Sequence, residues 1–112
     1  MARLTPMDAP SDQDAQQPIP GGTVLTRVVT ITNKRGLHAR AAARFVTTAE
    51  RFGASIDVLR DEQSVSARSI MGLMMLGAGP GATLELRAEG WDAKEALDAL
   101  AALVEAGFDE KG

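Results

Sequence analysis

The sequence predicts an α+β fold: an open-faced β-sandwich in which a four-stranded antiparallel sheet carries three helices on one face. Segments with apolar residues at every second position alternate with segments of helical apolar spacing, in the order βαββαβα. The cleanest alternation, at 83–89, indicates a strand with one buried and one solvated face. Such folds host many functions, so the architecture alone assigns none.

Length and composition set the outer limits. The chain has 112 residues, enough for one domain, and 45% of them are apolar. The net charge of −3 argues against general nucleic-acid binding, and we expect no membrane insertion because no apolar run is long enough. With no cysteine and one histidine we expect neither disulfides nor a metal site, and the composition fits a cytoplasmic protein.

The first 22 residues differ from the rest. They contain four of the five prolines, together with many Asp, Gln and Gly residues, and they lack the apolar stretch of a secretory signal. We therefore expect a flexible tail at 1–22 and a folded domain at 23–112. An ordered arm is the alternative reading of the tail.

The first half of the domain is predicted as strand, helix and hairpin. The β-branched segment 27–32 predicts the first strand. A helix over 39–52 follows, ended by Gly53. Strands at 55–60 and 64–67 then form a hairpin around a polar turn. The core stripe expected on the helix consists of Ala42, Phe45, Val46, Ala49 and Phe52.

The second half ends in a helix over about 92–106, after the strand at 83–89. Asp92 and Glu95 have the spacing of a capping box, and Trp91 is expected to pack against the start of the helix as a staple. Its predicted core stripe is Ala96, Leu97, Leu100, Leu103 and Val104.

The most informative turn is Gly36-Leu37-His38-Ala39-Arg40, which contains the only histidine. The alanines after it favour a helix that begins at or just after His38. First-turn N–H groups lack helical partners and bind anions, Arg40 can match phosphate oxygens, and imidazole is a nucleophile. These groups together predict a site that accepts a phosphoryl group on His38. A lone histidine at a helix start also occurs as a capping or surface residue.

Charge is uneven around this turn. Five cations and no acid occur between positions 23 and 49. Arg40 and Arg44 lie one turn apart and share a helix face. This segment is either a solvated helix face or a basic front that attracts phosphate or an acidic partner.

A short helix is predicted after Ser69, which is a good N-cap, with Gly77 as its end. The helix is apolar nearly all round, so it cannot bury every side. If Leu73 and Leu76 face the core, Ile70, Met71 and Met74 stay partly exposed and form a docking surface. The alternative is that all of them are core.

The Gly36–Arg40 motif and Ser69-Ile70-Met71-Gly72, at this separation and in this element order, resemble HPr, the histidine-containing phosphocarrier of the phosphoenolpyruvate-dependent phosphotransferase system. The likeness covers about 25–106. It implies a carrier without a cofactor, not an enzyme, that takes a phosphoryl group from enzyme I and passes it to an enzyme IIA-type acceptor. We expect a monomer.

The resemblance also implies residue roles. His38 is the phosphoryl acceptor through Nδ1, and Arg40 with the amides near Ala39 holds the phosphoryl group. Ser69 matches a regulatory serine that HPr kinase/phosphorylase modifies in many members. The partner surface would comprise Ile70, Met71 and Met74, together with Arg44.

Two departures leave the branch of the family open. Ala41 replaces the proline that usually follows the arginine, and Asp61-Glu62-Gln63 replaces a usual Gly-Lys turn. The alternative function is a regulatory, nitrogen-branch protein whose phosphorylation state controls its targets without sugar transport. A third reading is a structural or small-ligand module in which His38 has no role.

Overall fold

The computed structural model describes residues 23–110. The elements are β1 (Leu25–Thr30), α2 (Ala39–Ala49), β2 (Ser55–Arg60), β3 (Gln63–Ser66), α3 (Ile70–Met75), β4 (Thr83–Glu89), α4 (Ala93–Glu105) and the 3-10 turn η2 (Gly107–Asp109). The predicted α+β open-faced sandwich is confirmed. The expected tail at 1–22, and the last two residues of the predicted domain, lie outside the described residues.

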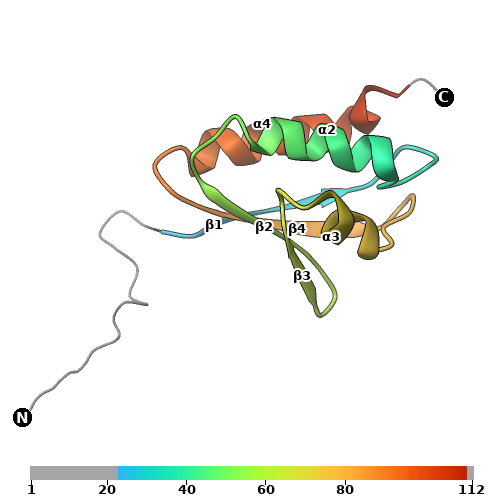
Figure 1. Ribbon diagram of the computed structural model, residues 1–112, viewed down its shortest axis with the longest axis horizontal. Helices are drawn as coiled ribbons and strands as arrows, with labels where there is room; N and C mark the ends of the chain where they lie inside the picture. The colour runs from blue at the N-terminus through green and yellow to red at the C-terminus, as the bar shows by residue number, and fades with distance from the viewer. Residues whose placement is uncertain (1–22, 111–112) are drawn as a thin grey trace, which may run out of the picture.

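The sheet has the strand order β1-β4-β2-β3, and all three pairings are antiparallel. Helices α2 and α4 lie side by side over one face of the sheet, and α3 lies against α2 and β3 (Figure 1). Strand alternation explains the layering, since Leu84, Leu86 and Ala88 point into the core while Thr83 and Arg87 are exposed.

The core is centred between the sheet and the two long helices. One buried cluster contains Phe45 of α2, Leu100 of α4, Ile56 and Leu86 of the central strands, and Phe108 of η2. Among the described residues, no helix is long and apolar enough to cross a membrane.

The end of α2 differs from the prediction. The helix stops at Ala49 and not at 52, with Glu50 as its C-cap, so Gly53 does not end it and Phe52 is only half-buried. The Gly53 and Ala54 amides instead donate to the Asp92 carboxylate, at 2.8 and 2.9 Å. This contact ties the α2–β2 loop to the start of α4.

The same contact overturns the predicted start of α4. Asp92 is the N-cap residue, but its side chain makes no capping hydrogen bond because both carboxylate oxygens serve the neighbouring loop. The capping box is therefore wrong. The staple is wrong as well, since the Trp91 side chain is 89% exposed.

Candidate functional site

The loop between β1 and α2 fixes the position of the histidine. Gly36 has a left-handed backbone (φ +64°), and a Cβ added there would lie 2.5 Å from the Ala78 carbonyl oxygen. The next residue, Leu37, is buried and donates its N–H to the same oxygen at 2.9 Å. Only glycine fits this close approach, which joins the loop before α2 to the loop after α3.

His38 is the N-cap of α2, with an extended backbone, as the sequence predicted for a helix that begins just after it. Its carbonyl oxygen accepts the first helical hydrogen bond, from the Ala42 N–H at 2.8 Å. The ring Nδ1 accepts from the Arg40 N–H at 3.3 Å, and the side chain is 16% exposed. Nδ1 therefore faces the first-turn amides of a helix that has no acidic residue in that turn.

The cations of the predicted basic segment have different surroundings. Arg40 is exposed beside His38. The Arg44 guanidinium donates to the Phe108 carbonyl oxygen, and Arg27 pairs with Asp98 on α4 at 2.5 Å. Asp109 lines the same surface groove as Arg40 and Arg44. The predicted basic segment thus does not form one uniform cationic front.

Glu110 contacts the candidate site, and the sequence analysis did not predict this contact. Its carboxylate binds Nε2 of His38 through Oε2 and accepts from the Asn33 amide through Oε1, at 2.8 Å. The hydrogen bond from Asn33, and secondarily that from His38, lowers the pKa of Glu110 below its ordinary value. The carboxylate is therefore ionised at neutral pH, next to the ring.

Helix α3 presents the second motif. Ser69 is its N-cap, and Ser69 Oγ accepts from the Gly72 N–H at 2.9 Å, as predicted. Leu73 and Leu76 are buried, while the remaining long apolar side chains are exposed. We call these exposed side chains the α3 patch: Ile70, Met71, Met74 and Met75. Met75, at 71% exposure, was absent from the predicted surface.

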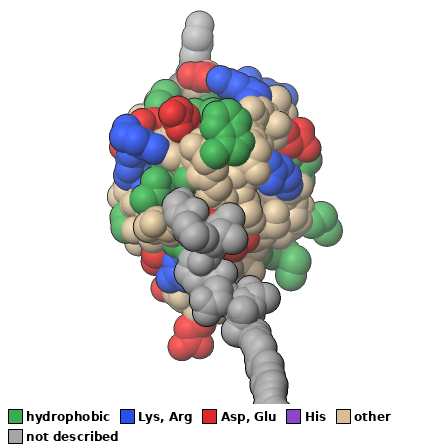
Figure 2. All heavy atoms as spheres, turned by 90° about the vertical axis from the view of Figure 1, so that its left-hand side faces the viewer, with side chains coloured by type: hydrophobic (Ala, Val, Ile, Leu, Met, Phe, Trp, Pro, Cys, Tyr) green, Lys and Arg blue, Asp and Glu red, His purple; other side chains and the backbone are tan. Residues whose placement is uncertain are grey.

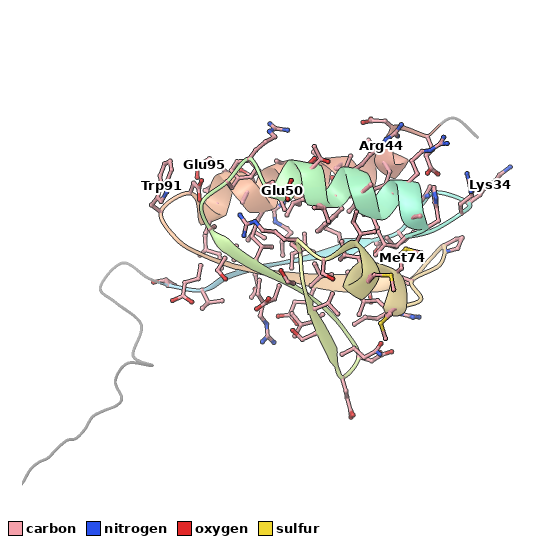
Figure 3. All side chains as sticks on the ribbon, viewed as in Figure 1. Lys34, Arg44, Glu50, Met74, Trp91 and Glu95 are labelled. Carbon is pink, nitrogen blue, oxygen red and sulfur yellow. The ribbon has the colours of Figure 1, made fainter. Side chains whose placement is uncertain are left out.

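The two motifs lie at one end of the molecule. Helix α3 packs against α2, and the loop after α3 holds the loop that carries His38. Figure 3 shows Met74 below α2, at the same end as Lys34 and Arg44. The opposite end, seen in Figure 2, mixes acidic and basic side chains around scattered hydrophobic ones.

Known proteins are similar to this chain over most of the described residues. The family model described as the PTS HPr component phosphorylation site matches residues 25–106. The phosphocarrier protein NPr of Shewanella violacea is 51% identical over 88 residues, which cover 79% of this chain and 97% of that protein. The phosphocarrier protein HPr of Cupriavidus necator is 47% identical over 87 residues, which cover 78% of this chain and 98% of that protein.

A solved structure agrees with the sequence matches. The crystal structure of an HPr from Thermoanaerobacter tengcongensis superposes with a TM-score of 0.75 at 46% identity, covering 79% of this chain and 99% of that one. Family model, relatives and fold thus coincide over the part of the chain that contains both motifs. The chain belongs to the HPr family.

Proposed function

We propose that this protein is a phosphocarrier that accepts a phosphoryl group from enzyme I on Nδ1 of His38 and passes it to an enzyme IIA-type acceptor. The observation that carries the proposal is the position of His38 as N-cap of α2, with Nδ1 3.3 Å from the Arg40 N–H. Relatives over the same residues are named phosphocarrier proteins. The proposed carrier acts as a cytoplasmic monomer and needs no cofactor.

The local chemistry supports reversible transfer. A phosphoryl group on Nδ1 takes the place of the ring as hydrogen-bond partner of the first-turn amides, near Ala39 and Arg40. The helix dipole adds about 0.3–1 kcal/mol of stabilisation for an anion at this end. The exposed Arg40 side chain is free to form a charge-assisted contact with the phosphoryl oxygens.

The α3 patch is the proposed docking surface for both partners. Four exposed apolar side chains on a six-residue helix form a compact hydrophobic area, and flexible methionines adapt to more than one partner. Arg44 is the proposed polar contact at the edge of the site. Its bond to the Phe108 carbonyl oxygen would have to be shared with or exchanged for a partner group.

Ser69 is the proposed regulatory site, modified by an HPr kinase/phosphorylase. Its Oγ already caps α3, and a phosphate there still offers acceptor oxygens to the Gly72 N–H. The modification adds up to about two negative charges beside the α3 patch. We expect these charges to weaken docking of an acidic partner.

The second candidate function is regulatory. The match to a protein named NPr favours a nitrogen-branch role, in which the phosphorylation state of His38 or Ser69 selects a target without sugar transport. Onward transfer from the phosphorylated protein to enzyme IIA-type acceptors separates the two. Transfer to a sugar-specific acceptor supports the first function, and failure with every such acceptor supports the second.

Incubation with phosphoenolpyruvate and enzyme I tests the shared step. The intact chain should gain one acid-labile phosphate, and His38→Ala should gain none. Phosphorylation retained in His38→Ala would refute the assignment of this residue. Absence of labelling in the intact chain would refute the phosphocarrier function itself.

A further inference from the structure

The chain that follows α4 folds back onto the start of α2. Gly107, Phe108 and Asp109 all have left-handed backbones (φ +66°, +58° and +61°), which reverse the direction of the chain. The Phe108 side chain is fully buried in the core, and its carbonyl oxygen accepts from Arg44 of α2. The buried Phe108 anchors this turn, and the turn places Glu110 next to His38.

The Glu110 carboxylate is held from two directions. Asn33, which is 8% exposed, donates through Nδ2 both to Glu110 Oε1 at 2.8 Å and to the Gly36 carbonyl oxygen at 3.0 Å. The other carboxylate oxygen binds Nε2 of His38. Asn33 thus links the glycine that shapes the loop to the carboxylate that contacts the ring.

This contact assigns the ring proton. An ionised carboxylate has only acceptors, so Nε2 must carry the hydrogen that bonds to Glu110. The neutral ring then has its lone pair on Nδ1, which agrees with Nδ1 accepting from the Arg40 N–H. If the ring were rotated by about 180° about its Cβ–Cγ bond, or protonated on Nδ1 only, it would lose both the contact with Glu110 and the hydrogen bond from the Arg40 N–H.

We propose that Glu110 is a positioning residue for phosphoryl transfer, which holds the Nε2–H of His38 so that the Nδ1 lone pair faces the incoming phosphoryl group. This inference rests on the phosphocarrier function proposed above. Asn33 is its support, since it fixes the free oxygen of the same carboxylate. Glu110 is not a phosphoryl ligand in this account and acts only through His38.

The transfer step follows from the assignment. The Nδ1 lone pair attacks the phosphorus of a phosphorylated donor protein, the Nδ1–P bond forms, and the bond from phosphorus to the donor atom breaks, with its electron pair leaving on the donor. The proton on Nε2 stays in place. The ring becomes positively charged, and the adjacent carboxylate offsets that charge. Onward transfer returns the electron pair to Nδ1.

The single histidine makes a direct test possible. In protein labelled with 15N-histidine, every ring signal belongs to His38. At about pH 8.5, where an ordinary imidazole is neutral, the Nε2–H proton should be visible because its hydrogen bond slows exchange with water. Glu110→Ala should lose this proton signal. Glu110→Gln, which keeps an acceptor oxygen, should retain it.

Kinetics of phosphorylation by enzyme I provide the second readout. Glu110→Ala should be phosphorylated about tenfold more slowly, as expected for loss of one charge-assisted hydrogen bond, and Glu110→Gln should be intermediate. The matched control is Glu105→Gln, which removes the same charge from the exposed last residue of α4 and should change neither readout.

Three results would overturn the proposal: no protected Nε2–H signal in the intact protein, an unchanged rate in Glu110→Ala, or faster phosphorylation in Glu110→Ala. The last would mean that Glu110 shields the ring instead of positioning it. The ring signals are read before any phosphorylation, so they report on Glu110 even if the intact chain accepts no phosphoryl group. Failure of the intact chain to accept a phosphoryl group would count against the phosphocarrier function.

Discussion

Substitution of Gly36 should disrupt both stability and the site, and two other glycines, Gly79 and Gly81, separate the causes. Gly36→Ala places a Cβ 2.5 Å from the Ala78 oxygen on a left-handed backbone. Gly81→Ala has the left-handed backbone (φ +87°) but no atom within 4 Å of the added Cβ, and Gly79→Ala has neither problem.

The expected magnitudes follow from these differences. A left-handed alanine costs about 1–2 kcal/mol, so Gly81→Ala should lower the free energy of unfolding by that amount. Gly36→Ala must also displace backbone and weaken the bond from the Leu37 N–H to Ala78, which adds about 1 kcal/mol. Gly79→Ala should be neutral or stabilising by up to about 1 kcal/mol.

Urea denaturation of the three variants measures these differences, and the melting temperature of Gly36→Ala should fall by about 10–20 °C. Phosphorylation by enzyme I should also slow in folded Gly36→Ala, because the displaced loop carries His38. Equal losses in Gly36→Ala and Gly81→Ala would refute the close approach to Ala78. If Gly36→Ala left the free energy of unfolding unchanged, the cost of the left-handed backbone at this position would be refuted as well.

Three other predictions concern the site. Arg40→Ala should slow phosphoryl transfer about tenfold or more while circular dichroism shows an intact fold, since one charge-assisted contact is lost; an unchanged rate would remove Arg40 from the site. Ser69→Asp should weaken enzyme I binding by about 1 kcal/mol, less at high salt, whereas Ser69→Ala should only lower stability by about 1 kcal/mol; equal affinity in titration calorimetry would argue against a charge effect. The Asn33 amide and His38 lower the pKa of Glu110 in the folded protein. The contacts of the Glu110 carboxylate therefore stabilise the fold fully above the pKa that Glu110 has in the unfolded chain. This stabilisation is lost as the pH falls through the lower pKa of the folded protein. The carboxyl carbon of Glu110 should therefore titrate by NMR below pH 4.5, and Asn33→Ala should raise that midpoint; a midpoint at or above 4.5 in the intact protein would contradict the contact.

Periodicity predicted the strands best where one face is buried. The strands at 55–60 and 83–89 match β2 and β4 residue for residue, because alternation there leaves one register that buries the apolar side chains. The first strand begins and ends two residues earlier than predicted. The backbone stays paired beyond its end, since Ile31 exchanges hydrogen bonds with the Gly81–Ala82 segment, which has no alternating pattern.

Helix ends were harder to predict because distant groups compete with local ones. Gly53 and Asp92 both carry local capping signals, yet they satisfy each other across 39 residues of sequence. Trp91, the residue before Asp92, is exposed and does not act as a staple. Spacing within a segment contains no information about such a partner.

The candidate site divides in the same way. The glycine, the histidine and the alanine-rich start of α2 are adjacent in sequence, so the cap geometry of His38 could be predicted. The contact between His38 and Glu110 spans 72 residues and depends on the left-handed turn at Phe108. The available signal was Gly107 after the last helix followed by a large apolar residue, a pattern that indicates a chain folding back into the core.

The most direct test of the account is to identify the phosphorylated atom. After incubation with enzyme I and phosphoenolpyruvate, 31P and 15N NMR of histidine-labelled protein should show one phosphoryl group bonded to Nδ1 of His38, with Nε2 still protonated. A phosphoryl group on Nε2, or on any other residue, would contradict the account, because the first-turn amides of α2 face Nδ1 of His38.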